Sequence, residues 1–344
     1  MPKKSMGGNN APRKVLVTGG GGFLGSAIVK LLVKRGDEVY SFSRNDHDLL
    51  RTLGVSQIKG DVRDNLALEK ACRGMKLVFH VAAKVGVWGE YTDFFDINVR
   101  GTKNVISSCK TCGVEGLIFT SSPSVVFNNQ DMAGVNESTP YPIRYHSHYP
   151  KTKAIAEKAV RNAAFEGLKT ITLRPHLIWG PEDSHLVPRI LKRSKRLKIV
   201  GHGNNLVDTV YIDNAAYAHI LAANQLEKKP ELSGNVYFIS QDQPVRLWDM
   251  INDILKAGGL EPIKGSIPFK TAWFIGFILE GLYKLFSLSC EPPMTRFVAN
   301  ELARSHWFDI RAAKKDLGYE PLISTKQGLK RLATWLQTER NYGN

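Results

Sequence analysis

The sequence predicts an α/β protein with a doubly wound parallel sheet and a smaller, mostly helical second lobe. Short β-branched runs alternate with helical segments over the first two-thirds of the 344 residues. A glycine-rich loop joins the first of these runs to the first helix, and the regular alternation loosens after Pro175. These features are typical of a parallel sheet that is wrapped by helices and followed by a less regular lobe.

The individual elements follow from hydrophobic periodicity, which separates β-branched strand runs from amphipathic helices. Residues 210–223 and 236–240 are expected to return to the sheet that the first six strands form with right-handed crossovers. We expect strands at 14–18, 38–42, 56–59, 77–81, 117–121 and 170–173, and helices at 23–35, 65–73, 93–112 and 149–166.

The chain divides into a tail, a sheet domain and a second lobe. Residues 1–12 are expected to form a flexible tail, because they carry two lysines but no apolar run of the kind that a signal peptide needs. Residues 13–175 form the sheet domain, to which 206–245 return. Residues 176–205 and 246–344 form the second lobe.

The longest apolar stretch, 271–288, is interrupted by Glu280 and Lys284. A bilayer span needs about 20 mostly uncharged residues, so we expect a buried or surface-lying helix here instead. The surrounding segment 262–318 shows no clear strands. Because neither a signal peptide nor a membrane span is predicted, we expect a cytoplasmic protein, with contact to a membrane surface left open.

The formal net charge of +15 is densest in the run RILKRSKRLK at 189–198. An acidic partner, an anionic lipid and a merely solvated face are all compatible with this run. No aromatic residues interleave with it, so we do not expect nucleic acid as a partner. Cys109 and Cys112 form a single CxxC at the end of a predicted helix, which favours free thiols in a reducing compartment over a redox pair or a metal site.

The glycine loop follows a predicted strand and opens a helix. Gly19, Gly22 and Gly25 have the spacing that permits a tight turn, a close approach of backbone N–H groups to a pyrophosphate and close packing of helix on strand. The start of the helix directs positive partial charge at the phosphates. This pattern predicts a bound dinucleotide.

The end of the second predicted strand distinguishes between dinucleotides. NAD-binding proteins usually carry Asp or Glu there to hold the ribose hydroxyls. Here Ser43 takes that position and Arg44 follows, and a guanidinium can hold a 2′-phosphate through two hydrogen bonds. We expect NADPH (NADP+) as the cofactor. Asp61 either meets the adenine edge or caps the helix that follows.

Tyr149 and Lys153 lie four residues apart at the start of a predicted helix, which puts both on one face. A phenol with a pKa of about 10 is a weak acid at neutral pH, and we expect the nearby ammonium to lower that pKa. The fifth strand ends in serines at the sheet edge where ligands bind. We select Ser122 to hydrogen-bond a substrate carbonyl, with Ser121 and Ser124 left open.

With these motifs the chain resembles the extended short-chain dehydrogenase/reductases, in their 3β-hydroxysteroid dehydrogenase-like branch. The matching segments are TGGGGFLG at 18–25, GDV at 60–62, HVAAK at 80–84, NVRGT at 98–102, FTSSPSV at 119–125, YPKTK at 149–153 and LRPHLIWGP at 173–181. The resemblance implies a Rossmann domain, oxidoreductase activity and a catalytic triad of Ser122, Tyr149 and Lys153, with Asn98 supporting the proton relay. The complete set of expected dinucleotide contacts, which includes residues named above, is Gly19, Gly22, Phe23, Leu24, Gly25, Ser43, Arg44, Asp61, Val62, Ala82, Ala83, Lys84, Asn98, Tyr149, Lys153, Pro175 and Ile178.

A closer resemblance, to the 2-alkyl-3-oxoalkanoate reductases of bacterial long-chain olefin biosynthesis, extends into the second lobe through LVDTVYIDNAAYAH at 206–219 and HWF at 306–308. It implies NADPH-dependent reduction of a long-chain 2-alkyl-3-keto acid. The partners it implies are an acyl-condensing enzyme, a β-lactone synthetase and a β-lactone decarboxylase, and a homodimer is usual in the family. A 3β-hydroxysteroid or sterol-4-carboxylate dehydrogenase, a sugar epimerase or dehydratase, and an NADP-sensing regulator without turnover remain as alternatives.

Several residues outside these motifs have open roles. Bulky apolar side chains of the stretch 271–288 indicate an oily substrate or a membrane contact, or they seal the second lobe against the sheet. They are Trp273, Phe274, Phe277, Ile278, Leu282, Tyr283 and Phe286. Trp88 and Trp179 either line the mouth of the site or belong to the core. His146 and His148 are either solvated or contact a substrate carboxylate. The basic residues Arg189, Lys192, Arg193 and Lys195 either attract that carboxylate or dock an acidic partner.

Overall fold

A parallel sheet forms the centre of the computed structural model, which describes residues 12–342, so that the expected tail lies, apart from Pro12, outside the described residues. The strands of this sheet are β1 (Lys14–Thr18), β2 (Glu38–Ser43), β3 (Ser56–Lys59), β4 (Leu77–His80), β5 (Gly116–Thr120), β7 (Lys169–Pro175) and β12 (Val236–Ile239). Their order is β12–β7–β5–β4–β1–β2–β3, and all neighbours are parallel. The expected doubly wound sheet is confirmed, with residues 236–239 returning to it as the last strand.

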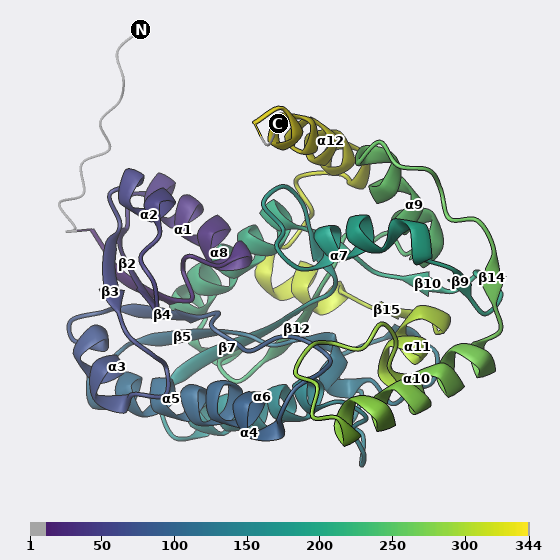
Figure 1. Cartoon of the computed structure of the whole chain (residues 1–344). Coiled ribbons are helices and arrows are strands. Elements are labelled where there is room, and N and C mark those ends of the chain that lie inside the picture. The colour runs from purple at the N-terminus through teal and green to yellow at the C-terminus, as the bar shows by residue number, and fades with distance from the viewer. Residues whose placement is uncertain (1–11, 343–344) are drawn as a thin grey trace, which may run out of the picture.

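Helices cover both faces of this sheet (Figure 1). One face carries α3 (Asn65–Cys72), α5 (Gly101–Thr111) and α6 (His148–Phe165), and the other carries α1 (Phe23–Arg35) and α8 (Ile212–Lys228). The period of two along β1 explains both layers, since successive side chains point to opposite faces. Leu16 packs in the core with α3, α5 and α6, whereas Val15 and Val17 pack in the core with α1 and α8.

The sheet order reverses at β1, which lies between β4 and β2. From β1 the chain first builds outwards through β2 and β3, and it then returns to add β4 on the other side. Ligands of open α/β sheets bind in the crevice at the carboxyl ends of the strands at such a reversal. The fold therefore places the functional crevice beside Thr18 and His80, which end β1 and β4.

The second lobe combines short strands with five α-helices, as far as residue 342. A four-stranded sheet has the order β13 (Val245–Arg246), β10 (Leu206–Val207), β15 (His306–Phe308) and β6 (Met132–Val135). Two further pairs join β8 (Ile178–Trp179) to β11 (Val210–Tyr211) and β9 (Ile199–Val200) to β14 (Ser266–Ile267). The helices are α7 (Leu186–Arg193), α9 (Leu247–Ala257), α10 (Phe269–Leu285), α11 (Arg296–Ala303) and α12 (Thr325–Tyr342).

The chain crosses between the two lobes more often than the division predicted from the sequence implies. Strand β6 lies within 13–175 and β10 within 206–245, yet both pair with second-lobe strands. The segment 262–318, in which no strands were expected, contains β14 and β15. These strands have two to four residues, too few for a period of two to be visible in the sequence.

Two differences concern the first domain. The short helix α2 (Asp48–Thr52) was not expected, and the helix expected at 93–112 is divided. It consists of α4 (Tyr91–Phe94), a π-helical turn (Phe95–Arg100) and α5. Such turns accommodate one extra residue within a helix, which the hydrophobic pattern does not reveal.

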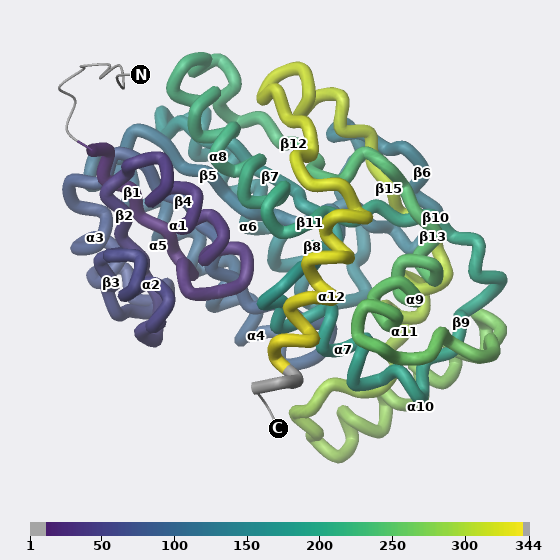
Figure 2. The backbone as a smooth tube through the Cα atoms, turned by 90° about the horizontal axis from the view of Figure 1, so that it is seen from above, coloured from purple at the N-terminus to yellow at the C-terminus, as the bar shows by residue number. Residues whose placement is uncertain are grey.

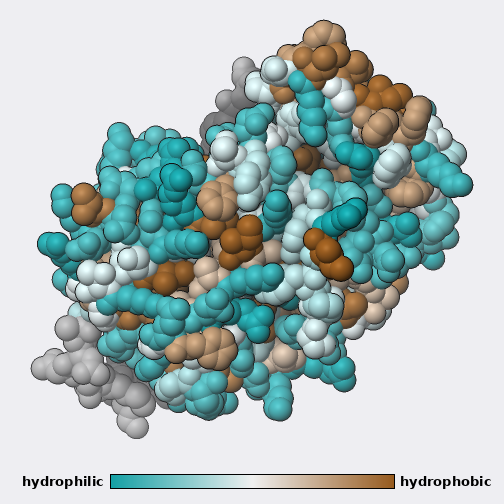
Figure 3. Space-filling view, turned by 90° about the horizontal axis from the view of Figure 1, so that it is seen from below, coloured by the Kyte–Doolittle hydropathy of each residue, from teal (hydrophilic) through white to brown (hydrophobic). Residues whose placement is uncertain are grey.

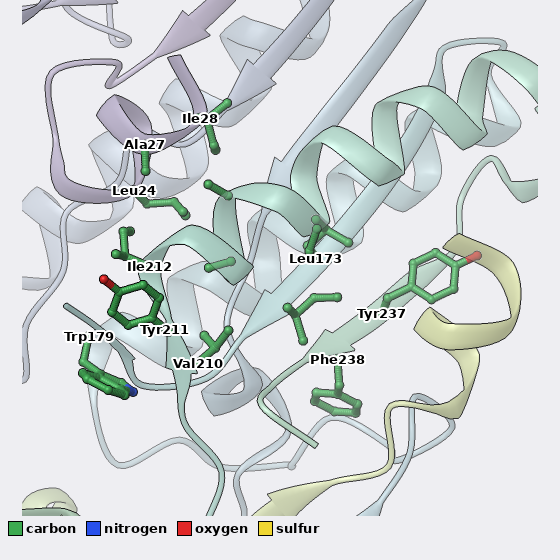
Figure 4. Close-up of a cluster of buried hydrophobic side chains, with 14 of the residues drawn as sticks. Leu24, Ala27, Ile28, Leu173, Trp179, Val210, Tyr211, Ile212, Tyr237 and Phe238 are labelled. Atoms are coloured by element: carbon green, nitrogen blue, oxygen red, sulfur yellow. The ribbon is translucent and has the colours of Figure 1, made fainter. Parts of the chain in front are cut away.

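One buried cluster joins the two lobes (Figure 4). Leu24 of α1, Ile212 of α8 and Tyr211 of β11 pack together there, and Trp179 of β8 lies 5.3 Å from the Tyr211 ring. The Trp179 indole donates a hydrogen bond to Thr209 Oγ1 at 3.2 Å. Figure 2 shows α12 running across the molecule between the lobes, and it packs against α9. The second lobe is thus fixed to the sheet by a continuous core.

Candidate active site

The glycine loop turns tightly between β1 and α1. Gly19 has a φ of +71°, and a Cβ there would come within 3.0 Å of the Ala82 backbone. A Cβ on Gly25 would lie 2.0 Å from the Gly19 carbonyl oxygen, so only glycine allows α1 to approach the loop this closely. No side chain caps the start of α1 at Gly22. The first backbone N–H groups of α1 are therefore available to an anion in the crevice.

A cleft of about 720 Å³ occupies the crevice at the carboxyl ends of β1 and β4. Each residue expected to contact a dinucleotide lines this cleft, with the single exception of Asn98. The fit to a dinucleotide is supported by the glycine turn at one wall, but the individual contacts stay predictions. The lining that sequence reasoning missed includes Asn45, His47, Gly60, Val85, Asp183 and His185.

The far end of the cleft is formed by the loops after β2 and β3. Ser43 donates a hydrogen bond to the Asn45 carbonyl oxygen at 2.8 Å, and Arg44 is exposed beside it. The Asp61 carboxylate accepts from Arg63 through Nε at 3.0 Å and Nη2 at 2.7 Å, and this guanidinium lowers the pKa of Asp61. The alternative role of Asp61 as a helix cap is wrong, because Asp64 caps α3 by accepting from the Ala67 N–H at 3.0 Å.

Asn98 lies behind the wall of the cleft, in the π-helical turn. Its Oδ1 accepts from the Lys84 N–H at 2.8 Å, and its Nδ2 donates to the Lys84 carbonyl at 3.0 Å and to Thr152 Oγ1 at 3.1 Å. Asn98 thus ties the loop after β4 to α6, which makes it a positioning residue here. The Lys84 ammonium pairs with Asp93 at 2.6 Å.

Ser122, Tyr149 and Lys153 meet at the inner end of the cleft. Tyr149 and Lys153 lie one turn apart at the start of α6, and the Tyr149 hydroxyl is hydrogen-bonded to Ser122. Ser122 Oγ also lies 2.9 Å from Ser124 Oγ. Ser121 also lines the cleft, but Ser122 is the candidate serine that is hydrogen-bonded to the phenol, which favours it over Ser121 and Ser124.

We expected the Lys153 ammonium to lower the pKa of Tyr149, but it does not. It donates to the Thr120 carbonyl at 2.6 Å and lies 4.1 Å from the centre of the Phe119 ring. Burial raises the pKa of Tyr149 to about 12, opposed by the hydrogen bond from Ser122. Burial lowers the pKa of Lys153 to about 7, opposed by the Glu157 carboxylate. Tyr149 therefore holds its proton at neutral pH.

A second cavity, of about 530 Å³, adjoins the cleft. Ser122 and Tyr149 line both spaces, as do Pro175 and Leu177. Most of the other lining is apolar and comes from α7, α9 and α11 and from the loop after β4. It includes Val87, Trp88, Phe127, Leu186, Ile190, Leu247, Met250, Ile251, Ile254, Phe297, Val298, Leu302 and Phe308.

A pair of histidines lies within the lining of this cavity. His176 Nε2 and His306 Nδ1 are 2.7 Å apart, and His306 Nε2 lies 2.9 Å from the Glu301 carbonyl oxygen. A carbonyl only accepts, so His306 donates through Nε2. Burial holds the pKa of His176 well below its usual range. The cavity thus contains a hydrogen-bonded histidine pair that sequence reasoning did not connect.

The remaining candidate residues fall into three groups. Trp88 and Trp179 line the apolar cavity, and Trp179 is at the same time fully buried in the core. Arg189 and Arg193 also line it and pair with Glu291, at 2.6 Å for Arg189. The remaining residues line neither space, namely His146, His148, Lys192 and Lys195.

Comparisons with known proteins match this geometry. A model of the 3-beta hydroxysteroid dehydrogenase/isomerase family matches residues 16–270. A 2-alkyl-3-oxoalkanoate reductase of Shewanella oneidensis is 48% identical over 327 residues, covering 92% of this chain and 84% of that protein. A protein of the same name from Stenotrophomonas maltophilia is 45% identical over 323 residues, covering 93% and 98%.

More distant similarities lie in sterol metabolism and among solved structures. The mouse sterol-4-alpha-carboxylate 3-dehydrogenase, decarboxylating, is 33% identical, covering 93% of this chain and 90% of that protein. The solved structure of MoeE5 in complex with UDP-glucose and NAD is 25% identical with a TM-score of 0.74, covering 96% of this chain and 99% of that one. The crystal structure of gox2253 gives a TM-score of 0.77 at 25% identity, covering 94% and 98%.

Proposed function

Because this chain belongs to the 3-beta hydroxysteroid dehydrogenase/isomerase family, we propose that it reduces a 2-alkyl-3-oxoalkanoate to the 2-alkyl-3-hydroxyalkanoate with NADPH. The chain is an oxidoreductase of the extended short-chain dehydrogenase type and uses a nicotinamide dinucleotide. The observation that carries the proposal is the wall shared by the two spaces. Ser122 and Tyr149 face both the cleft for a dinucleotide and an apolar cavity.

The chemistry takes place at this shared wall. When bound, the dihydronicotinamide of the cofactor supplies the hydride for the carbonyl carbon. Ser122 and Tyr149 hydrogen-bond the ketone oxygen and polarise it. Tyr149 then gives its proton to that oxygen, and Lys153 stabilises the phenolate that remains once its ammonium turns from the Thr120 carbonyl toward the phenol.

The protonated form of Tyr149 suits the acid step of the proposed reduction. A phenol with a pKa of about 12 is fully protonated at neutral pH and is ready to donate to a ketone oxygen. Oxidation of an alcohol would need the phenolate as a base, and burial disfavours this form. A sterol-oxidising activity is less well supported than reduction, because the mouse relative named for it is 33% identical to this chain whereas the named reductases are 45% and 48% identical.

We propose NADPH rather than NADH as the cofactor because of the residues in the loop after β2. Ser43 and the exposed Arg44 replace the acidic residue that would repel a 2′-phosphate, and Arg63 already neutralises the Asp61 carboxylate nearby. Arg44→Glu should weaken NADPH binding about tenfold or more while changing NADH binding much less, since only NADPH carries the phosphate. Titration of both dinucleotides measures this change, and an equal loss of both would contradict the assignment.

The apolar cavity supports a substrate with long alkyl chains. Its lining from α9 and α11 offers hydrocarbon surface but few hydrogen-bond donors, which suits an acyl chain better than a sugar. In long-chain olefin synthesis the keto acid would come from an acyl-condensing enzyme. The hydroxy acid would pass to a β-lactone synthetase and then a β-lactone decarboxylase. These partners, and a homodimer, are part of the proposal.

Turnover of defined substrates tests the function. The purified protein is given NADPH with a long-chain 2-alkyl-3-oxo acid and, in parallel, NAD+ with a sterol-4-carboxylate. We expect consumption of NADPH with the oxo acid and formation of the 3-hydroxy acid by mass spectrometry. Turnover of the sterol alone would contradict the proposed substrate. Binding of NADPH without any turnover would contradict the proposed enzymatic activity.

Tyr149→Phe tests the proposed acid. Loss of the phenol should reduce kcat by about 10²–10⁴-fold while NADPH affinity stays within a few-fold. Tyr145→Phe is the matched control, because the Tyr145 hydroxyl donates to the Val125 carbonyl at 2.9 Å and the residue lines neither space. A comparable kcat loss in the control would point to disturbed packing.

A further inference from the structure

Helix α10 packs with its small residues inwards and its bulky residues outwards. Ala272, Gly276 and Glu280, spaced four apart, are its buried residues. A Cβ on Gly276 would lie 2.6 Å from the Thr295 carbonyl carbon, so α11 and its approach rest directly on this narrow face. An amphipathic helix of a globular protein normally buries its large apolar side chains. Helix α10 does the opposite, so the alternative in which its bulky residues seal the second lobe is wrong, and none of these residues lines the apolar cavity.

The outward side of α10 and the residues after it form one apolar face, which we call the α10 face. Of the sixteen large hydrophobic residues that are exposed in the described part of the chain, nine belong to it. In Figure 3 hydrophobic residues gather at the upper right, over this helix. The α10 face consists of Trp273, Phe274, Ile275, Phe277, Ile278, Leu282, Leu285, Phe286 and Leu288, which are between 37% and 75% exposed.

The charge around the α10 face is positive. Lys270 and Lys284 lie on the helix, and the one carboxylate of the helix, Glu280, is bound by Arg296 through the backbone N–H at 2.7 Å and Nε at 2.8 Å. The Arg296 guanidinium also lies over the Trp273 and Phe277 rings. The α10 face therefore presents cations and apolar surface without a free carboxylate.

The basic run 189–198 adjoins both ends of α10. At the far end, Arg193 donates to the Pro293 carbonyl at 3.2 Å, in the segment that follows the helix. At the near end, β9 continues the run and pairs with β14, which leads into α10. Four cations of the run are exposed and have no ion-pair partner among the described residues, namely Lys192, Lys195, Arg196 and Lys198.

We propose that the α10 face docks this protein on the surface of an anionic lipid bilayer. Trp, Phe and Leu side chains on a helix flanked by lysines and arginines are the pattern of helices that lie in the membrane interface. Each cation near an anionic leaflet adds to the attraction. Helix α10 lies on the membrane under this proposal, as none of the helices between residues 12 and 342 is long and apolar enough to cross one.

Charge disfavours a second copy of the chain as the occupant of the α10 face. Two copies meeting through this face would bring two basic runs together within a molecule of net charge +15. An anionic leaflet offers the opposite charge along with a deformable apolar layer. A bilayer satisfies both the apolar and the basic part of the surface at once.

Docking through α10 would also place the apolar cavity beside the membrane. The segment after α10 is held over the cavity, where the Trp88 indole donates to the Leu288 carbonyl at 3.1 Å and Arg189 pairs with Glu291. Phe297 and Val298 of α11, against which α10 packs, line the cavity itself. An alkyl chain in the bilayer would then lie within a short path of the space that Tyr149 faces.

Vesicle co-sedimentation tests the proposal. The full chain is mixed with vesicles of phosphatidylcholine alone or of phosphatidylcholine with phosphatidylglycerol. We expect at least about tenfold stronger partitioning onto the anionic vesicles at low salt, reduced by high salt. Phe274→Gln/Leu285→Gln/Phe286→Gln should lower this binding about tenfold or more, whereas the charge variant Lys192→Gln/Lys195→Gln/Arg196→Gln/Lys198→Gln should lose the preference for anionic lipid.

The matched control removes exposed hydrophobic residues elsewhere. Leu66→Gln/Ile143→Gln/Phe165→Gln changes side chains that are 70%, 100% and 88% exposed on other surfaces, and it should bind vesicles like the wild type. Circular dichroism verifies the fold of each variant. A wild type that stays in solution with both vesicle types overturns the proposal, and so does an equal loss in the control. Light scattering that finds a dimer which the α10 variant dissociates, without vesicle binding, would assign the face to a second copy.

Discussion

The dinucleotide cleft and the apolar cavity share one wall but are built in different ways. The cleft lies along the ends of parallel strands, and its glycine turn brings backbone against backbone. The cavity is enclosed by side chains from helices and short strands that are far apart in the chain. A rigid sheet edge thus holds the part that reacts, while separate helices enclose the part that would receive the substrate. Variants on either side should therefore differ in what they change.

The largest difference is expected in stability. In the sheet domain the Glu157 carboxylate pairs with Arg174 and both are fully buried, and Tyr141 donates to the same carboxylate at 2.7 Å. Glu157→Ala leaves the Arg174 charge buried alone, which should lower the free energy of unfolding by about 3–5 kcal/mol. In the second lobe Glu280→Ala should cost about 1–2 kcal/mol, because Arg296 is partly exposed. Urea titrations measure both, and equal losses would remove the distinction.

A smaller but sharper difference is expected between two glycines. Gly25→Ala forces a Cβ against the Gly19 carbonyl oxygen, a close contact that should cost about 1–3 kcal/mol and weaken NADPH binding about tenfold to hundredfold. Gly281→Ala in α10 meets no atom within 4 Å and should leave NADPH binding unchanged. Calorimetric titration with NADPH compares the two. Unchanged binding in Gly25→Ala would show that the loop can move away.

Filling the apolar cavity should affect the substrate and spare the cofactor. Met250 on α9 is buried in the cavity wall, so Met250→Trp reduces the space for an alkyl chain. Overpacking of this kind should lower kcat/KM for a long-chain oxo acid about tenfold, with little effect on a short-chain one or on NADPH affinity. Steady-state kinetics on both substrates gives the ratio. An equal loss for both chain lengths would mean that the chain lies elsewhere.

The pH profile tests the shared wall itself. Burial lowers the pKa of Lys153 to about 7, so its ammonium predominates below this pH and is lost above it. If the ammonium stabilises the phenolate, kcat/KM for reduction should fall about tenfold per pH unit above neutrality. Lys153→Arg keeps the charge and should flatten this fall at a lower overall rate. A wild-type profile that stays flat well above neutrality would contradict the role of Lys153.

The sequence predicts the cleft better than the cavity for a physical reason. The glycine turn, Ser122 and the pair of Tyr149 and Lys153 each lie in a short continuous segment whose geometry follows from one strand end or one helical turn. His176 and His306 are 130 residues apart, and no local pattern shows that they meet. The placement of Asn98 behind the cleft wall likewise depends on the π-helical turn, which a hydrophobic pattern does not reveal.

The orientation of α10 could not be predicted from the hydrophobic periodicity either. Its apolar residues surround most of the helix, so the pattern does not say which side is inward. A signal was nevertheless present in the spacing of Ala272 and Gly276, since small residues four apart mark a face on which another backbone can rest, and Glu280 continues this row. The Glu280 carboxylate within this row predicts a cationic partner, and Arg296 supplies it.

The π-helical turn at Phe95–Arg100 makes the number of residues in this segment important for the direction of its side chains. Each residue of a helix advances the side-chain direction by about 100°, so removing one residue here would rotate everything that precedes it relative to α5. Asn98 could then no longer reach both Lys84 and Thr152. Substitutions around the turn are tolerable as long as Asn98 keeps its direction, whereas a single-residue deletion would release the loop after β4 from α6. Chain length at this point constrains the protein more strictly than its side-chain chemistry.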